Sequence, residues 1–175
     1  VEIMVIRDMF NLTMSYRPNS DIYAPYAYTK VEKRHKTSQG SKKNYAAGKN
    51  KLAFWLASSC STYSRRESLV DTLQHYIPFD TYGGCGTFKC PKDKDAECWD
   101  KFEKEYKFAF TFESSICKHY AGERMWKPLQ KNIVPVVLGG ALYKDIFPPH
   151  SFIDISDFKS IRRLSNFLFS LDGND

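Results

Sequence analysis

Short apolar runs alternate along this chain with segments of helical spacing, and this alternation restricts the fold more than any other feature. Residues 52–57 (LAFWLA) are apolar throughout, which is typical of a strand buried on both faces of a sheet. With 175 residues, this order predicts one domain, or one lobe of a larger protein, with an α/β fold and a Rossmann-like parallel sheet that has helices on both faces. The expected strands are residues 52–57, 77–82, 106–112, 132–138 and 151–155. The expected helices are residues 66–76, 95–104 and 119–130, followed by a last helix that Asp157 caps. The buried face of this last helix is expected to carry Ile161, Leu164, Phe167 and Leu168.

A sheet of this type binds its ligand beyond the carboxyl ends of its strands. The loops at residues 58–64, 83–90, 113–117 and 139–142 are therefore expected to line the site. The sequence has no P-loop, and no GxGxxG follows a strand, so ATP and NAD binding have no support in it.

The first of these loops has the composition of an anion site. Ser58 and Ser59 follow the first expected strand, and Arg66 lies a few residues further on. Small hydroxyl side chains and an arginine suit phosphate. A capped helix start is the simpler alternative.

A second candidate lies in the loop and helix at residues 112–129. Tyr120, Glu123 and Arg124 are three and four residues apart, so they are expected on one helical face. A helix start beside hydroxyl residues and a cation can hold phosphate. The alternative is an ordinary amphipathic helix with an exposed ion pair.

Asp93 and Asp95 form a DxD sequence, with which many sugar-nucleotide enzymes hold a divalent metal. They lie in a run of alternating charge, PKDKD, that no strand precedes. We expect a solvated turn there and no metal site.

Five cysteines and one glycosylation sequon favour a secretory compartment. The sequon begins at Asn11, and the cysteines lack the paired CxxC spacing of a zinc site. Their odd number leaves one thiol free or paired outside the chain, and the pairing stays open. The chain starts at Val1 and not at a methionine, and it has no signal peptide, so we expect a piece of a longer protein. It also has no apolar run of roughly 18 residues, which is the length of a transmembrane helix. The cysteines are Cys60, Cys85, Cys90, Cys98 and Cys117.

The formal net charge of +6 comes from one segment. Residues 30–51 carry eight basic residues and one acid, so the rest of the chain is nearly neutral. This segment shows no helical or strand periodicity, and Tyr45 is its only aromatic residue, whereas a nucleic-acid site usually has several. A surface loop is the favoured interpretation, and no nucleic-acid partner is expected.

Residues 112–124 and 133–139 resemble the α1,3-fucosyltransferase signature. Here the family pattern FENSxxKDYxTEK reads FESSICKHYAGER, and the family pattern VPVVLG follows unchanged. The YGGCG sequence at residues 82–86 most resembles the invertebrate and plant enzymes that fucosylate the N-glycan core. Matching stretches also occur at residues 10–17, 20–22, 25–26 and 148–154, in the family order.

The resemblance implies a two-lobed GT-B glycosyltransferase, of which this chain is the C-terminal lobe. Residues 1–29 would be the segment that enters from an N-terminal lobe, 30–51 a basic loop, and 52–175 the Rossmann-like lobe that binds GDP-fucose. The implied reaction is inverting transfer of L-fucose to a GlcNAc 3-hydroxyl of an N-glycan core or N-acetyllactosamine-type glycan, in the Golgi lumen, by a single-pass type II membrane protein. No tightly bound cofactor is implied; a divalent metal would at most stimulate and would not bind Asp93 or Asp95.

The resemblance also implies which residues bind the donor. Arg66 and Arg124 would stabilise the departing GDP, and Glu123 would hold a hydroxyl group of the sugar. The general base would lie in the N-terminal lobe, so the isolated chain is expected not to turn over. The implied donor contacts are Tyr26, Ser58, Ser59, Arg66, Ser114, Tyr120, Glu123 and Arg124.

Six positions depart from the family pattern, and they leave a second hypothesis open. A non-catalytic relative could keep the fold and serve as a binding or interaction protein, because each lost contact weakens donor binding. The six are Ser59, Ala109, Ser114, His119, Gly122 and Arg124.

Overall fold

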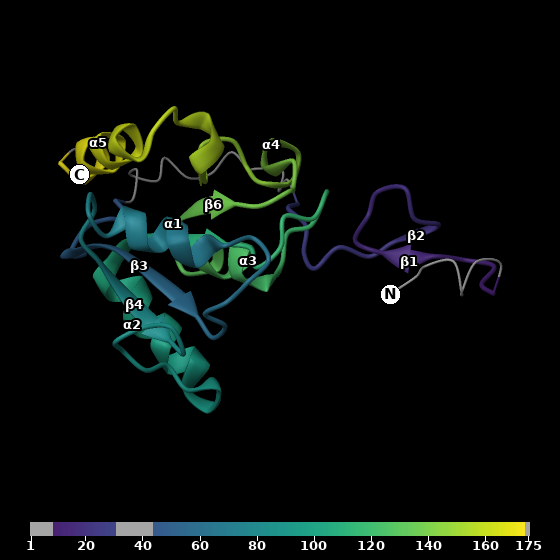
Figure 1. Ribbon diagram of the computed structural model, residues 1–175, viewed down its shortest axis with the longest axis horizontal. Helices are drawn as coiled ribbons and strands as arrows, with labels where there is room; N and C mark the ends of the chain where they lie inside the picture. The colour runs from purple at the N-terminus through teal and green to yellow at the C-terminus, as the bar shows by residue number, and fades with distance from the viewer. Residues whose placement is uncertain (1–8, 31–43, 174–175) are drawn as a thin grey trace, which may run out of the picture.

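The computed structural model describes residues 9–30 and 44–173, and its centre is a parallel sheet of five strands. The strand order is β4-β3-β5-β6-β7, and every neighbouring pair is parallel (Figure 1). The strands are β3 (Lys51–Ala57), β4 (Phe79–Gly83), β5 (Tyr106–Phe112), β6 (Val134–Leu138) and β7 (Ile153–Asp154). The expected α/β class with a Rossmann-like sheet is confirmed.

Helices connect consecutive strands, as parallel strands require. The helices are α1 (Arg66–Leu73), α2 (Asp95–Glu105), α3 (Glu123–Gln130), α4 (Tyr143–Ile146) and α5 (Ile161–Asp172), with 3-10 turns η2 (Lys92–Lys94) and η3 (Ile155–Asp157). Nearer the N-terminus, β1 (Met14–Ser15) and β2 (Ile22–Tyr23) pair with each other in a separate ladder that projects from the main body (Figure 1). None of the described helices is both long and apolar enough to span a membrane.

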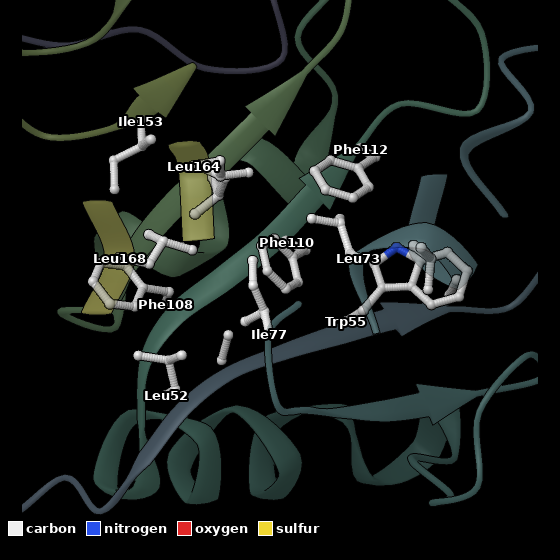
Figure 2. Close-up of a cluster of buried hydrophobic side chains, with 14 residues drawn as sticks. Leu52, Trp55, Leu73, Ile77, Phe108, Phe110, Phe112, Ile153, Leu164 and Leu168 are labelled. Carbon is white, nitrogen blue, oxygen red and sulfur yellow. The ribbon is translucent and has the colours of Figure 1, made fainter. Parts of the chain in front are cut away.

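Hydrophobic side chains cover the sheet on both faces, because successive residues of a strand point in opposite directions. On one face Phe108, Phe110 and Phe112 of β5 pack with residues of α1 and α5, such as Leu73 and Leu164 (Figure 2). On the other face β3 and β5 contribute Phe54 and Ala109, which pack with Trp99 and Phe102 of α2. Helices α3 and α4 form a third cluster with Val137 of β6. The expected helices on both faces are therefore confirmed.

The strand order locates the ligand site of the sheet. From β3 the chain moves outward to β4 on one side, then returns to place β5 on the other side of β3. In doubly wound sheets of this order, the loops after the two strands at the reversal diverge and leave a crevice. The crevice expected here lies at the carboxyl ends of β3 and β5.

The third expected helix begins later than the sequence pattern suggested. We expected a helix over residues 119–130, but α3 begins at Glu123. Distant groups hold the preceding residues out of the helix: His119 has a φ of 66° and donates its amide to the carbonyl of Gly140, and the Gly122 amide donates to Glu113. Tyr120 is therefore in a loop and does not share a helical face with Glu123 and Arg124.

The last helix is also capped differently from our expectation. Asp157 ends η3, and the N-cap of α5 is Ser160, whose hydroxyl accepts from the Arg163 amide at 3.3 Å. Leu164 and Leu168 are fully buried, as expected, but Phe167 is 40% exposed and does not belong to the buried face.

Several expected strands and one helix are shorter than the patterns suggested, because prolines and tight turns replace their ends. Strand β4 begins after Pro78, which cannot donate to the ladder, and β6 begins after Asn132, whose φ is 51°. Likewise, the expected strand at 151–155 is reduced to the two residues of β7, and α1 ends at Leu73.

The described part of the basic segment is anchored. Lys51 is the first residue of β3, so the loop ends one residue earlier than expected, and its ammonium pairs with Asp80 at 3.0 Å. Lys49 donates to the carbonyl of Asn132 at 2.6 Å. Both lie at the amino end of β3, opposite the expected ligand site. The other basic residues of the segment, except Lys30, lie outside the described residues: Lys33, Arg34, Lys36, Lys42 and Lys43.

Candidate functional site

A cavity of about 670 Å³ opens at the carboxyl ends of β3 and β4, between α2 and α3, so it lies to the β4 side of the crevice that the strand order placed at β3 and β5. The first two expected loops, 58–64 and 83–90, contribute to its wall. The loops at 113–117 and 139–142, which follow β5 and β6, do not line it. The lining residues are Leu56, Ser58, Gly83, Gly84, Lys89, Cys90, Pro91, Lys92, Asp95, Trp99, Glu123, Arg124 and Lys127.

Arg124 connects the first turn of α3 to the end of β3. Its guanidinium donates to the carbonyl of Leu56 and, at 2.9 Å, to the hydroxyl of Ser58. Burial lowers the pKa of Arg124, and the nearby carboxylates of Glu113 and Glu123 oppose that change. The guanidinium therefore lies at the wall of the cavity with neutral oxygens as its hydrogen-bond acceptors.

Arg66 lies behind this wall and is 4% exposed. Its guanidinium donates to the carbonyl of Phe112 at 2.6 Å and to that of Ser59 at 3.4 Å, so it links the ends of β3 and β5. Burial and the charge of Arg124 lower the pKa of Arg66. Arg66 is thus expected to brace both loops, and its Nε also pairs with Glu67 at 3.6 Å, which offsets part of its positive charge.

Glu113 is a buried carboxylate near the two arginines; it belongs to the second candidate segment of the sequence but was not among the expected donor contacts. It follows β5, is 7% exposed, and accepts from the Gly122 amide at 2.7 Å. Burial raises the pKa of Glu113, and the charges of Arg66 and Arg124 limit the rise. It holds the start of α3 against the end of β5.

The serines of the two loops have different environments. Both Ser58 and Ser59 are exposed, but Ser58 lines the cavity and contacts Arg124, whereas Ser59 offers its carbonyl to Arg66. Ser114 is exposed outside the cavity wall, and its carbonyl accepts from the Ser64 amide at 3.0 Å. The Ser64 hydroxyl also donates to the carbonyl of Glu113 at 2.7 Å, so the loops after β3 and β5 are joined.

Two disulfides fix the loops around the cavity. Cys60–Cys85 joins the loops after β3 and β4, and Cys90–Cys98 joins the cavity rim to the first turns of α2. Cys117 carries a free thiol. The pairing that the sequence left open is therefore settled, with two disulfides at the site.

The remaining expected donor contacts surround the start of α3. Tyr26 comes from the N-terminal segment, and partial desolvation together with the charge of Glu123 raises its pKa. Tyr120 makes an edge-to-face contact with Tyr16, with ring centroids 5.0 Å apart. Burial and the charge of Glu113 raise the pKa of Tyr120. Of the eight expected contacts, Ser58, Glu123 and Arg124 line the cavity, and the other five do not.

Lys127 organises the acidic side of the cavity, and the sequence analysis missed it. Its ammonium pairs with Asp95 at 2.6 Å and with Glu123 at 2.7 Å, and it lies over the ring of Trp99. Burial alone would lower the pKa of Lys127, but these two carboxylates raise it. The spacing of four residues from Glu123 was the available signal. No local pattern places Asp95 opposite Lys127.

The two aspartates of the DxD sequence have different surroundings. Asp93 is exposed within η2, as a solvated turn requires, whereas Asp95 is partly covered and bound to Lys127. Across residues 9–30 and 44–173, no group of three or more His, Cys, Asp or Glu side chains is arranged to hold a metal ion.

Comparisons with known proteins place similar sequences in one family. The model for "Glycosyltransferase family 10 (fucosyltransferase) C-term" matches residues 46–175. The alpha-(1,3)-fucosyltransferase fut-1 of Caenorhabditis elegans is 40% identical over 170 residues, which are 95% of this chain and 39% of that protein. Alpha-(1,3)-fucosyltransferase C of Drosophila melanogaster is 34% identical over 175 residues, covering 91% of this chain and 41% of its own length. The chain thus spans about two fifths of the length of these relatives.

A solved structure shares the fold. The crystal structure of an α1,3-fucosyltransferase with GDP-fucose superposes with a TM-score of 0.59 at 21% identity, covering 70% of this chain and 35% of the other. At this identity the likeness concerns the fold, and it agrees with the expected GT-B lobe. These comparisons lend no support to the non-catalytic alternative.

Proposed function

Because the chain belongs to glycosyltransferase family 10, the fucosyltransferases, we propose that the cavity beside Arg124 binds GDP-fucose as a sugar donor. The observation that carries this proposal is the placement of Arg124. Its guanidinium is held by the carbonyl of Leu56 and the hydroxyl of Ser58 at the end of β3. A fixed cation at the carboxyl end of a parallel strand suits a diphosphate.

The proposed reaction is inverting transfer of L-fucose to the 3-hydroxyl of a GlcNAc residue in a glycan. The acceptor oxygen forms a bond to the anomeric carbon of fucose while the bond from that carbon to the β-phosphate oxygen breaks. A general base, which we place outside residues 1–175, takes the acceptor proton, and GDP leaves with both bonding electrons. The chain alone is therefore expected to bind the donor without turning it over.

The two arginines have different parts in this proposal. Arg124 meets the diphosphate directly and stabilises the negative charge that develops as the bond breaks. Arg66 is covered by the loops that it braces, so it adds its charge from beneath and keeps Ser59 and the end of β5 in place. Positioned charges need no rearrangement during the reaction.

The other donor contacts follow from their positions around α3. Glu123 would accept from a hydroxyl group of fucose, and Tyr26 beside it would border the same end of the site. Ser58 would contact phosphate together with Arg124. Ser59, Ser114 and Tyr120 do not line the cavity, and they are proposed as donor contacts from the family resemblance alone.

The acceptor and the location are proposed from the family and the sequon. We propose an N-glycan core or N-acetyllactosamine-type acceptor, and the Golgi lumen as the place of action, with membrane attachment through a segment outside this chain. Asn11 is exposed, so it is accessible as a glycosylation site in that compartment.

Calorimetric titration of the 175-residue chain with GDP tests the proposal. Saturable binding, with competition from GDP-fucose, is the expected result. Absence of binding at millimolar GDP would overturn it. Glycan acceptor added to the chain with GDP-fucose should release no GDP, because the base is proposed to lie elsewhere.

A further inference from the structure

The cavity contains an acid that the proposed transfer does not use. Asp95 and Glu123 are its two carboxylates, and both bind Lys127. Glu123 has a proposed partner in a fucose hydroxyl, but Asp95 has none. Lys127 carries one charge for these two carboxylates, so a ligand of this site that brings hydrogen-bond donors to Asp95 would be favoured.

The surroundings of Asp95 show where those donors would lie. Asp95 is the first residue of α2, across the cavity from the Arg124 end, and Lys127 lies between α2 and α3. Lys89 and Lys92 also line the cavity, so charge alone does not orient the nucleotide. With the diphosphate at Arg124, as proposed above, the base is expected to extend toward α2 and Asp95.

The wall near Asp95 suits a flat base. Trp99, one turn along α2, and Pro91 form an apolar side of the cavity, and the Cys90–Cys98 disulfide fixes the rim there. Trp99 is 4% exposed, and among the described residues its indole N–H has no acceptor. Guanine presents two acceptors, O6 and N7, in addition to its donors.

Resting on the proposed function, we infer that Asp95 is the residue that selects guanine, by accepting hydrogen bonds from its N1–H and 2-amino groups. The Lys127 ion pair uses Oδ2 of Asp95, and an ionised carboxylate has about four lone-pair positions, so it can accept further bonds. Adenine presents an acceptor nitrogen in the same place, which the carboxylate would repel. Uracil presents one N–H between two carbonyl oxygens. The carboxylate thus favours GDP over ADP and UDP.

Inosine diphosphate isolates the interaction, because it differs from GDP only by the missing 2-amino group. Titrations of GDP and IDP into the chain and into Asp95→Asn form a double-mutant cycle. The unaltered chain should bind GDP about tenfold more tightly than IDP, since a hydrogen bond to a charged group has this magnitude. In Asp95→Asn this preference should fall below about threefold, because the carboxylate is gone.

Two further variants make the result decisive. Asp93→Asn removes the same charge two residues away, on η2 outside the cavity wall, and should keep the preference for GDP. Asp95→Glu should retain most of it, because the carboxylate remains, and this variant also serves if Asp95→Asn does not fold.

The outcomes separate this inference from the proposed function. If Asp95→Asn weakens GDP and IDP equally, Asp95 only positions Lys127 and the inference is overturned. If Asp95→Glu loses the preference while it still binds GDP, the inference is overturned as well. If the unaltered chain binds no nucleoside diphosphate, the proposed function itself fails.

Discussion

The guanidinium of Arg124 donates to the Ser58 hydroxyl at 2.9 Å, so the first turn of α3 is tied to the residue that follows β3. A second bond to the carbonyl of Leu56 fixes the same group. Within the described chain, no carboxylate forms an ion pair with this guanidinium. Its charge therefore remains available to an anion in the cavity.

Arg124→Ala should weaken GDP binding at least tenfold, because a charge-assisted contact to phosphate contributes about 1.5–3 kcal/mol. Ser58→Ala should weaken it less, about threefold to fivefold, because Arg124 keeps its charge and its bond to the Leu56 carbonyl. Calorimetry measures both. Arg163→Ala, at an exposed position of α5, is the matched control and should leave the affinity unchanged. Equal affinities of Arg124→Ala and the control would remove Arg124 from the site.

Gly83→Ala should destabilise the fold far more than Gly48→Ala, although both glycines have a positive φ. A Cβ atom at Gly83, where φ is 90°, would lie 2.4 Å from the carbonyl oxygen of Ala57 on β3. At Gly48, where φ is 82°, no atom lies within 4 Å of the added Cβ. Gly48→Ala should therefore lower the free energy of unfolding by about 1 kcal/mol from backbone strain alone.

For Gly83→Ala we expect a loss of about 3 kcal/mol or more, because β3 and β4 must separate at the cavity. Urea unfolding of both variants measures the difference. Similar losses would show that the close approach of the two strands contributes nothing.

Glu113→Gln should change how stability depends on pH. Burial raises the pKa of Glu113 above its ordinary value of 4.5, so the folded protein holds this proton more tightly than the unfolded chain. The stabilisation from the protonated carboxyl is complete below pH 4.5 and is lost as the pH rises through the folded-state pKa. Gln cannot titrate, and it still accepts from the Gly122 amide.

The free energy of unfolding of Glu113→Gln should therefore rise, relative to that of the unaltered chain, as the pH increases from about 4 to 7. Urea titrations of both proteins at several pH values give this difference in the free energy of unfolding. The other acids contribute equally to both proteins, so their effect cancels in the difference. If the difference in the free energy of unfolding does not vary with pH, folding does not raise the pKa of Glu113.

The main sheet could be predicted because its strands carry a local signal. Residues 106–112 are mostly aromatic or apolar, and β5 spans Tyr106–Phe112 as expected. The family resemblance at residues 112–124 was confirmed as well. Both depend on the order of residues along one short segment, which a single sequence displays.

The start of α3 and the composition of the cavity could not be predicted in the same way. The helix begins at Glu123 because Glu113 and Gly140 bind the amides of Gly122 and His119, and such contacts leave no periodic pattern. Asp95 and Lys127 are likewise joined only in the folded chain. We expected the DxD sequence to be a solvated turn without a metal, and its pattern did not indicate that Asp95 binds Lys127.

Removing the Cys60–Cys85 disulfide should both destabilise the chain and loosen the cavity. The cysteines are 25 residues apart, so in the chain-entropy model the bond contributes about 3.5 kcal/mol, against about 2.5 kcal/mol for Cys90–Cys98 with its separation of 8. Replacing both cysteines of a pair by serine should lower the free energy of unfolding, and the loss should be larger for Cys60–Cys85 than for Cys90–Cys98. Cys117→Ser, which removes a free thiol, is the control.

The Cys60–Cys85 disulfide should also affect GDP binding. Cys60 follows Ser58 by two residues and Cys85 follows Gly84, so loss of this bond should weaken the binding. Unfolding in urea and calorimetry on the same variants measure both effects. If the double variant binds GDP as tightly as Cys117→Ser does, the disulfide stabilises the fold without shaping the site.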